Sequence, residues 1–542
     1  MAMLSLAAVL AEPAWRRPEH TALVEGALRI SFAELWRQAR AQAAALERLG
    51  VRPGDRVALM VPNTAEFPRA YYAVLAAGGV VVPVHLLLTV DEAEHVLRDS
   101  GSTLLLCHAA QAETGAAAAA RVGIRMVTLG PDVPVPGADG RLEDLAATVE
   151  PLATYVTRDS EDPAVVFYTS GTTGVPKGAV LSHLNMVMNA TVNAFDTNDV
   201  RADDVALGAL PLFHSFGQTV SMNSTWRAGA TLVLLPRFTA AAAVDLMAEE
   251  GVTSFHGVPT MYVALIEAAR HAARLPKLRF CISGGAALPT SVLEDFEKVY
   301  GAQVFEGYGL SETSPGTTVN QPAFGARAGT VGHPLWGVEV EIARADLDER
   351  IELLPRDTLG EVVIRGHNVF SGYLGRPEAT EEALVDGWFR TGDLGIKDAD
   401  GYLRIVDRKK DIVIRGGFNV YPLEVEDVLM RHPSIAQVAV IGLPDPVHGE
   451  EVCAVVVVDT SADRRADAST GASGGATGAA STGAASDASA DPKPTEDEIV
   501  AWARERLGRH KYPRRVEFVD EMPLGPSLKI LKRELRRRYS ED

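Results

Sequence analysis

Cysteine is scarce in this chain, and long apolar runs are lacking. The three cysteines, Cys107, Cys281 and Cys453, lie far apart in the sequence and show no spacing typical of a metal site. We therefore expect buried thiols in a reducing compartment and no disulfides. No run reaches the roughly 18–20 uninterrupted apolar residues that a membrane-spanning helix requires, so we expect no stable membrane insertion.

Basic residues are also in deficit. The chain has 52 Lys and Arg against 71 Asp and Glu, for a net charge of −19, and this balance argues against nucleic acid as the main partner. Residues 2–10 are apolar but lack the basic stretch that begins a signal peptide. We expect an amphipathic helix there and a cytoplasmic location.

The remaining composition is that of a globular protein with more than one domain. Hydrophobic residues make up 47% and charged residues 23% of the 542 residues, which allows more than one buried core. Strand-like and helix-like segments alternate up to about residue 304, an order that predicts an α/β fold with parallel sheets and helices on their faces. Strands are expected at residues 55–60, 79–84, 205–210, 231–235 and 279–283, with a smaller β element at 338–342 and 360–364.

A change of pattern near Lys410 predicts a second, smaller domain. Residues 459–494 are mostly Ala, Gly, Ser, Thr and Asp without an aromatic residue, which predicts a disordered insertion. We thus expect a large domain at 1–409 and a small α+β domain at 410–542. The small domain is expected to hold strands at 412–414, 435–441 and 451–458 and helices at 423–431 and 495–507.

One stretch, residues 168–178, combines hydrogen-bond donors at a density that flexible surface loops seldom reach. It reads Tyr-Thr-Ser-Gly-Thr-Thr-Gly-Val-Pro-Lys-Gly, between two strand-like runs. Glycine lets backbone N–H groups approach an anion, the hydroxyls donate further hydrogen bonds, and Lys177 adds a positive charge. The pattern predicts phosphate binding over a plain Ser/Thr/Gly loop. It is not a P-loop, whose lysine directly follows the second glycine, because Lys177 comes three residues after Gly174.

This stretch resembles the phosphate loop of the adenylate-forming superfamily, which includes acyl-CoA synthetases, firefly-type luciferases and peptide-synthetase adenylation domains. The superfamily's other motifs follow in order and cover nearly the whole chain, and the chain looks most like fatty acyl-CoA ligases. The resemblance implies that ATP is held while a carboxylate attacks its α-phosphorus. The nucleotide-binding residues that it implies in this stretch are Thr169, Ser170, Gly171, Thr172, Thr173, Gly174 and Lys177.

A second motif, residues 305–313, joins a carboxylate to hydroxyls and an aromatic ring. A carboxylate beside hydroxyls suits Mg²⁺ shared with substrate phosphates, although a glycine-rich turn with a solvated Glu is the alternative. The resemblance assigns Glu312, together with Thr172, to Mg²⁺, Ser311 to the α-phosphate or the acyl carboxylate, and Tyr308 to adenine. It extends the nucleotide site to Glu306, Gly307 and Gly309 and, upstream, to Gly285 and Ala286.

A third motif centres on Asp393, which follows Thr391 and Gly392. A tight turn that presents Asp393 can bind two hydroxyl donors, such as those of a ribose diol. A plain Asx turn is the alternative interpretation. The resemblance makes Asp393 the ribose ligand.

The charged cluster at residues 407–411 is either a solvated linker or, as the resemblance implies, a hinge between domains. In that case Lys410 is the pivot and Arg408 contacts ribose or phosphate. The glycines that follow, Gly416 and Gly417, let the chain pass close to the arm of CoA, and the resemblance places Phe418 beside them.

The last motif lies in the basic C-terminal region, which a solvated tail would also explain. The resemblance makes Lys529 the catalytic lysine that bridges carboxylate, ribose and α-phosphate and stabilises developing charge. The superfamily has Gly before this lysine, whereas this chain has Leu528. A leucine at positive φ would cost roughly 1–2 kcal/mol, so we expect slower adenylation. The thioester step should suffer less, because the resemblance implies that the lysine leaves the site when the small domain turns.

The acyl side of the site is expected near His214. This residue is either a core histidine or, as the resemblance implies, a shield of the acyl pocket that turns during catalysis. Apolar candidates without an evident basic residue for a second carboxylate favour a fatty or aromatic monocarboxylate, and we predict a medium- or long-chain fatty acid. The expected catalytic residues are Lys529, Glu312, His214 and Lys177, and the expected acyl pocket is His214, Val258, Met261, Gly284 and Gly307.

The resemblance thus predicts a two-step ligase that uses ATP, Mg²⁺ and CoA. A carboxylic acid and ATP give acyl-AMP and pyrophosphate, the small domain rotates, and CoA takes the acyl group. The protein is expected to be a monomer or homodimer. Two alternatives are a stand-alone adenylation enzyme that loads a carrier protein, and a nucleotide-binding variant whose catalysis Leu528 weakens.

Overall fold

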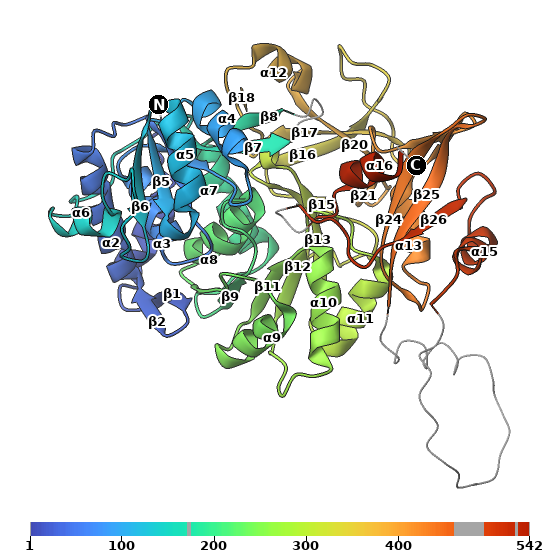
Figure 1. Cartoon of the computed structure of the whole chain (residues 1–542), viewed down its shortest axis with the longest axis horizontal. Helices are drawn as coiled ribbons and strands as arrows, with labels where there is room; N and C mark the ends of the chain where they lie inside the picture. The colour runs from blue at the N-terminus through green and yellow to red at the C-terminus, as the bar shows by residue number, and fades with distance from the viewer. Residues whose placement is uncertain (1, 171–174, 460–492, 526–528, 541–542) are drawn as a thin grey trace, which may run out of the picture. The chain divides into compact units, whose positions relative to one another are not determined.

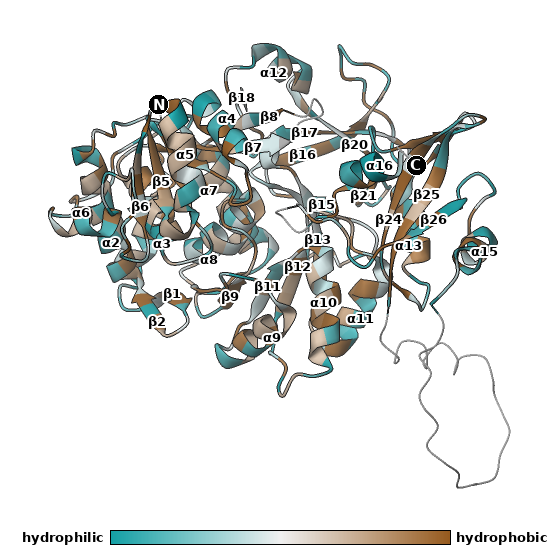
Figure 2. Cartoon of the chain, in the orientation of Figure 1, coloured by the Kyte–Doolittle hydropathy of each residue, from teal (hydrophilic) through white to brown (hydrophobic). Residues whose placement is uncertain are grey.

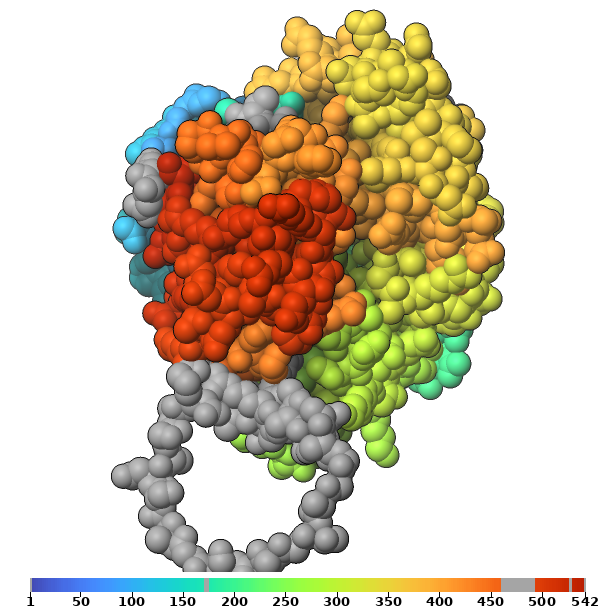
Figure 3. Space-filling model, turned by 90° about the vertical axis from the view of Figure 1, so that its right-hand side faces the viewer, coloured from blue at the N-terminus to red at the C-terminus, as the bar shows by residue number. Residues whose placement is uncertain are grey.

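The computed structural model describes residues 2–170, 175–459, 493–525 and 529–540. It divides into two compact units, each described by itself below. Unit 1 comprises Met1–Leu288 and Val292–Ile405, and unit 2 comprises Pro289–Ser291 and Val406–Asp542. Figure 3 shows the described residues of unit 2 from Val406 onward in orange and red. The predicted functional boundary between residues 409 and 410 stays a prediction.

Sheet A of unit 1 has a parallel centre with antiparallel edges. Strands β1, β10, β9, β11, β12 and β13 pair in parallel in this order, and β2, β14 and β15 extend the sheet antiparallel. The central strands β10, β11 and β12 are short and all their residues are buried, as parallel strands covered by helices require. Their bounds are β1 Thr21–Glu25, β2 Leu28–Ser31, β9 Val205–Gly208, β10 Thr231–Leu234, β11 Ser254–Gly257, β12 Phe280–Ser283, β13 Val304–Gly309, β14 Gly316–Val319 and β15 His333–Pro334.

Sheet B of unit 1 repeats this design. Strands β6, β5, β3, β4 and β7 are parallel neighbours, and β8 and β18 follow antiparallel beyond β7. The parallel strands carry long buried apolar runs that pack against α4 and α5. Their bounds are β3 Arg56–Met60, β4 Val80–Pro83, β5 Leu104–His108, β6 Arg125–Leu129, β7 Pro163–Ser170, β8 Pro176–Ser182 and β18 Gly372–Tyr373.

Sheet C is antiparallel, in the order β16-β17-β20-β19, with β21 on β20. β17 begins with five consecutive buried residues, and its register with β20 shifts between Glu361 and Val363. The bounds are β16 Val338–Ala343, β17 Gly360–Gly366, β19 Leu384–Val385, β20 Trp388–Lys397 and β21 Leu403–Arg408.

The helices of unit 1 cover these sheets, and α10 and α11 lie beside β11, β12 and β13 in Figure 1. Tyr262 of α10 packs its ring on Phe255 of β11 and on Phe296 of α11, which fixes this layer. The bounds are α1 Ala8–Arg16, α2 Phe32–Arg48, α3 Glu66–Ala76, α4 Val90–Ser100, η1 Ala109–Gln111, α5 Ala112–Val122, α6 Leu142–Ala147, α7 His183–Val192, η2 Asn193–Thr197, η3 Gly217–Asn223, α8 Ser224–Arg227, α9 Ala240–Glu249, α10 Pro259–Ala269, α11 Thr290–Tyr300, η4 Ser311–Thr313 and α12 Pro377–Ala383.

Unit 2 is built on sheet D, in the order β23-β22-β25-β24, with β26 parallel to β25. Helix α16 is strongly hydrophilic, as its teal colour in Figure 2 shows, yet Leu535 and Tyr539 pack with Ile441 and Val455 in the core. The bounds are β22 Val413–Arg415, β23 Phe418–Val420, α13 Pro422–Leu429, β24 Ile435–Asp445, β25 Gly449–Val458, α15 Glu496–Arg506, β26 Arg515–Phe518 and α16 Lys532–Ser540.

The predicted fold class is confirmed: a mixed α/β fold with layered parallel sheets, a separate β element and a smaller C-terminal unit. The expected N-terminal helix is displaced, since α1 spans Ala8–Arg16 and residues 4–7 precede it outside any helix. No helix in the described ranges is long and apolar enough to cross a membrane. The insertion predicted at 459–494 lies mostly outside the described residues.

Candidate functional site

The first predicted motif forms a β-hairpin whose arms reach further into the motif than expected. Strands β7 and β8 pair antiparallel, with Thr169 opposite Lys177 and Tyr168 opposite Gly178. A Cβ on Gly178 would lie 2.8 Å from the Cγ1 atom of Val166, which explains glycine at this position. The predicted loop is therefore shorter than residues 168–178, because the pairing of β7 with β8 continues to Ser170 and Pro176. The predicted residues Gly171, Thr172, Thr173 and Gly174, and the side chain of Ser170, lie outside the described part of the chain.

Glu312 of the second motif meets this hairpin. Its carboxylate oxygen Oε1 accepts hydrogen bonds from the hydroxyl of Thr169 at 3.1 Å and from the hydroxyl of Tyr373 at 3.0 Å. The ammonium of Lys177 lies over the Tyr373 ring, 5.3 Å from its centroid. Two segments remote in sequence thus meet at Glu312, which is 7% exposed, and Lys177 lies over the ring of one of its two partners.

Tyr373 was not predicted from the sequence. It lies in the short strand β18, which pairs with β8, so its backbone is fixed to the hairpin that carries Lys177. Burial, and then the nearby Glu312 carboxylate, raise the pKa of Tyr373, so the hydroxyl stays protonated and donates. A lone tyrosine in a Gly-Tyr-Leu sequence gives no signal of this role.

Tyr308 and Asp393 form a second contact between predicted residues. The Tyr308 hydroxyl donates to Oδ2 of Asp393 at 2.6 Å. Asp393 was expected in a tight turn, but it lies inside strand β20, where residues 391–393 stand opposite the single residue Val362. Gly392 has a φ of +71°, as the bulge requires. The carboxylate of Asp393 is 3% exposed, so the bulge presents a largely buried acid.

The loop after β12 lies beside the second motif. The N–H of Gly284 donates to the carbonyl oxygen of Gly257 at 3.2 Å, and Gly285 has a φ of +85°. Gly285 and Ala286 are exposed. Oε1 of Glu306 accepts the N–H of Leu288 at 3.2 Å and so ties this loop to β13. The predicted nucleotide contact of Glu306 stays a prediction beside this structural bond.

His214 precedes a helical segment packed against the same loop. His214 is half-buried, and its Nδ1 accepts the N–H of Phe216 at 3.2 Å. The hydroxyls of Ser215 and Ser311 lie 3.2 Å apart, which brings this segment to the second motif. A Cβ on Gly284 would lie 3.2 Å from the Phe216 ring.

Glycine is required at two places around this segment. A Cβ on Gly217, where η3 begins, would overlap the carbonyl oxygen of Pro211. A Cβ on Gly309, the last residue of β13, would overlap that of Pro315. The other predicted acyl residues lie in neighbouring elements. Val258 is the N-cap of α10 and Met261 lies in its first turn, and they are 2% and 1% exposed. Gly307 lies in β13.

Within unit 2, Arg408 ends β21 and Lys410 lies in the turn that follows. The buried carboxylate of Asp407 accepts the N–H groups of Arg408 at 2.8 Å and Leu423 at 3.0 Å, which ties this turn to the start of α13. Burial raises the pKa of Asp407 to about 6, against the opposing charge of Lys532.

The remaining predicted residues also lie in unit 2. Gly416 and Gly417 form the turn between β22 and β23 with φ of +56° and +82°. Phe418 is 60% exposed, with its ring 5.0 Å from that of His510. The carbonyl of Lys529 accepts the N–H of Gly525 at 2.7 Å. Leu528 lies outside the described residues.

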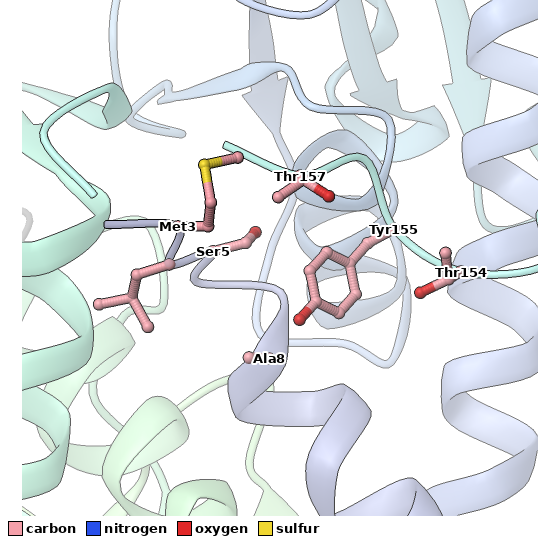
Figure 4. Close-up of a pocket in the computed structure, with 7 residues that line it drawn as sticks. Met3, Ser5, Ala8, Thr154, Tyr155 and Thr157 are labelled. Atoms are coloured by element: carbon pink, nitrogen blue, oxygen red, sulfur yellow. The ribbon is translucent and has the colours of Figure 1, made fainter. Parts of the chain in front are cut away.

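Three further features of the chain concern its possible metal ligands, its cysteines and one hollow. In the described ranges, no group of three or more His, Cys, Asp or Glu side chains is arranged to hold a metal ion by itself. The cysteines are free and buried, as predicted, and burial raises the pKa of Cys107 to about 12. A hollow of about 250 Å³ in unit 1 is lined by the N-terminal segment around Met3 and by Tyr155 with its neighbours (Figure 4).

The chain matches two family models. Residues 10–374 match the AMP-binding enzyme family, and residues 424–529 match its C-terminal domain. The chain therefore belongs to the AMP-binding enzyme family, the adenylate-forming superfamily that its motifs resemble.

Similar proteins narrow the class further. A feruloyl-CoA synthase of Amycolatopsis sp is 38% identical over 524 residues, 96% of each chain. A long-chain-fatty-acid–CoA ligase of Bacillus subtilis is 34% identical over 570 residues, 99% of this chain and 95% of the relative. Among solved structures, ATP-bound MatB from Rhodopseudomonas palustris superposes with a TM-score of 0.85 at 34% identity and 99% coverage of both chains.

Proposed function

We propose that this protein is an AMP-forming acyl-CoA ligase. It joins a carboxylic acid to ATP, giving acyl-AMP and pyrophosphate, and then transfers the acyl group to CoA with release of AMP. The family match and the naming of both similar enzymes as CoA ligases or synthases support the reaction. The observation that carries the proposal is the meeting of Thr169 and Tyr373 on Glu312, with Lys177 over the Tyr373 ring.

The proposed nucleotide site has its phosphate end at this convergence. The β7–β8 hairpin with Lys177, and the segment 171–174, hold the phosphates. Glu312, with Thr172, would hold Mg²⁺, because this ion prefers oxygen ligands such as a carboxylate. When bound, the ion would neutralise charge on the phosphates. Ser311 is proposed to contact the α-phosphate or the carboxylate of the acid, Tyr308 the adenine, and Asp393 the ribose. The remaining residues of the proposed nucleotide site are Gly285, Ala286, Glu306, Gly307 and Gly309.

Unit 2 supplies the proposed mobile groups. Lys529 stabilises the negative charge that develops as the carboxylate attacks the α-phosphorus, because an ammonium there pairs with oxygens of both reactants. Rotation about Lys410 then replaces Lys529 with the turn at Gly416 and Gly417, which together with Phe418 receives the arm of CoA. Arg408 contacts ribose or phosphate. One site thereby serves two reactions in succession.

The acid is proposed to be a monocarboxylate with a largely apolar body. Buried Val258 and Met261 support an apolar lining, and His214 is proposed to shield the pocket. A medium- or long-chain fatty acid fits the similarity to the Bacillus ligase. An aryl-propenoic acid is the second candidate, favoured by the 38% identity to the feruloyl-CoA synthase.

A panel of acids tests the proposal directly. The purified protein is mixed with ATP, Mg²⁺ and each acid, and pyrophosphate and acyl-CoA are measured with and without CoA. We expect both products with at least one acid, and no need for a carrier protein. Pyrophosphate without thioester would instead favour the loading of a carrier protein. No pyrophosphate with any fatty or aryl acid would contradict the proposal.

Leu528 is proposed to slow adenylation. Replacing it by the glycine typical of the superfamily, Leu528→Gly, should raise the rate of pyrophosphate release several-fold, because relief of roughly 1–2 kcal/mol of strain corresponds to about a 5- to 30-fold change. The thioester step, started from preformed acyl-AMP, should change little. An unchanged adenylation rate would show that the leucine is tolerated.

A further inference from the structure

Buried polar side chains of η3 meet His256 of β11 at Ser221. His256 of β11 is 2% exposed, and Gln218 and Ser221 of η3 are fully buried. Nδ1 of His256 and the hydroxyl of Ser221 lie 3.2 Å apart. The Gln218 amide donates to the carbonyl oxygen of Leu212 at 3.1 Å. We call His256, Gln218, Thr219 and Ser221 the His256 cluster.

Three members of the cluster each have one polar side-chain atom without a hydrogen-bond partner among the described residues. Nε2 of His256, Oε1 of Gln218 and Oγ1 of Thr219 are buried and have no hydrogen-bond partner among the described residues. Buried polar atoms without partners are rare in folded proteins because desolvation is not repaid, and each requires an explanation. Three in neighbouring segments point to a ligand that supplies the missing bonds.

The cluster lies at the end of sheet A that the proposed acyl site needs. His256 is the third residue of β11, and the next residue, Gly257, pairs with Ser283 and accepts the N–H of Gly284. From there the sheet continues to β13, which leads into Ser311 and Glu312. On the η3 side, the N–H of Gln218 donates to the carbonyl oxygen of His214. Open α/β sheets bind ligands at these carboxyl ends.

The segment that carries Gln218 and Ser221 is itself unusual. Residues Gly217–Asn223 form a π-helix, and all seven are buried. A π-helical turn is rare and is found frequently at functional sites, since it redirects side chains that an α-helix would stack elsewhere. Here it brings Ser221 to His256 and leaves Gln218 and Thr219 facing the interior.

We infer that the His256 cluster recognises a hydroxyl group on the body of the acid, remote from its carboxylate. This inference rests on the proposed ligase function and specifies its substrate. A hydroxyl can donate to one cluster atom and accept from another, which matches a set of mixed donors and acceptors. Both a phenolic acid and a hydroxylated fatty acid carry this chemistry.

The protonation state of His256 agrees with a neutral partner. Burial lowers the pKa of His256 to about 4, so the imidazole is uncharged at neutral pH. An uncharged ring forms a hydrogen bond with a hydroxyl but carries no positive charge to offset the burial of a second carboxylate. Dicarboxylic acids should accordingly be poor substrates.

Matched pairs of acids test the inference on the unmodified protein. The kcat/KM for CoA-dependent pyrophosphate release is compared for 4-hydroxycinnamate against cinnamate and for 12-hydroxydodecanoate against dodecanoate. We expect the kcat/KM of the hydroxylated acid to exceed that of its partner by about tenfold or more in one pair. That pair tells whether the hydroxyl belongs to a phenolic acid or to a fatty acid. Turnover with a ratio near one in both pairs would overturn the inference and leave the ligase intact. No turnover of any acid would overturn the ligase proposal itself.

Substitutions then assign the preference to the cluster. His256→Leu and Gln218→Met should bring the favoured ratio towards one while the unsubstituted acid is still turned over. The matched control is His183→Leu, because His183 is also fully buried and its Nε2 also has no partner among the described residues, but it begins α7. It should keep the wild-type ratio. A ratio of two acids is independent of the folded fraction, so partial misfolding does not mask the result. An unchanged ratio in His256→Leu would contradict the assignment.

Discussion

The hydroxyl of Tyr373 is one of two, with that of Thr169, that hold the Glu312 carboxylate on which the proposed phosphate site depends. Tyr373→Phe removes the donor to Glu312 but keeps the ring beneath Lys177. A hydrogen bond to a charged group contributes about 1.5–3 kcal/mol, so we expect pyrophosphate release to fall by roughly tenfold or more and to require more Mg²⁺. The measurement is the adenylation rate across a titration of Mg²⁺.

The control for this substitution is Tyr168→Phe. Tyr168 lies on β7, one residue before Thr169, and its hydroxyl donates to Asp99, not to Glu312. Its loss should leave the Mg²⁺ dependence as in the wild type. Equal Mg²⁺ dependence in both variants would show that Tyr373 does not position Glu312.

Asp407 gives unit 2 a pH dependence of defined sign. Its folded pKa of about 6 is above the ordinary value of 3.8, so the native state binds the extra proton. The stability that this contributes is present below pH 4 and is lost as the pH rises through 6. Relative to Asp407→Asn, the wild type should therefore lose up to about 3 kcal/mol between pH 4 and 7.

Hydrogen exchange of peptides from unit 2, corrected for intrinsic rates, measures this difference. The amide of Leu423, which donates to Asp407, should report it most directly. Parallel pH profiles for wild type and Asp407→Asn would show that the acid is ionised throughout this range.

At the scale of elements, the cap of α7 connects the hairpin to Tyr373. Ser182 ends β8 and accepts the N–H of Asn185, which in turn bonds the Ser182 N–H. Asn185 also donates to the carbonyls of His367 and Val369, a few residues before β18. Ser182→Ala should cost about 1 kcal/mol of stability and should also slow adenylation slightly, because this anchor loosens.

Thermal unfolding and the adenylation rate check this expectation together. Ser182→Thr keeps the accepting hydroxyl and is the control, so it should lie closer to the wild type in both measurements. A melting temperature for Ser182→Ala equal to that of the wild type would mean that the helix start is held by packing alone.

The elements were predictable from sequence where periodicity was strong. The expected strands at 55–60, 205–210 and 279–283 correspond to β3, β9 and β12. Motif boundaries were less predictable. Strand residues extend into the phosphate motif at Thr169 and Lys177, and Asp393 lies in a strand bulge, because cross-strand pairing overrides the local turn preference of glycine and Asp.

The site was predictable only as far as its motifs. The pattern indicated Glu312, Lys177 and Thr169, but it gave no sign of Tyr373, which contacts both Glu312 and Lys177 and is about 60 residues from Glu312 along the chain. The same holds for the His256 cluster. β11 pairs with β9, the strand that precedes η3 in the chain, and this neighbourhood brings Ser221 to His256. Such pairings are set by topology, and one sequence does not encode them locally.

For the whole molecule, the proposed rotation about Lys410 makes the two half-reactions separable. Lys410→Pro fixes φ near −65° at the turn after β21 and should restrict rotation. We expect pyrophosphate release in the first half-reaction to stay within about twofold of the wild type, while thioester formation falls at least about tenfold. Single-turnover measurements of each step, with Lys410→Ala as the control, distinguish these effects.

An equal loss of both half-reactions in Lys410→Pro would argue for a folding defect, and no loss would place the pivot elsewhere. Lys410→Ala removes the charge but leaves the backbone free, so it should retain both steps.

The absence of a side chain at Gly217 limits how the enzyme can be redesigned. A single added methyl group would meet the main chain at Pro211, just where η3 begins. Saturation libraries intended to alter acid preference should consequently vary Gln218, Thr219 and His256 and hold Gly217 constant. Deep mutational scanning should then record almost complete intolerance at that codon.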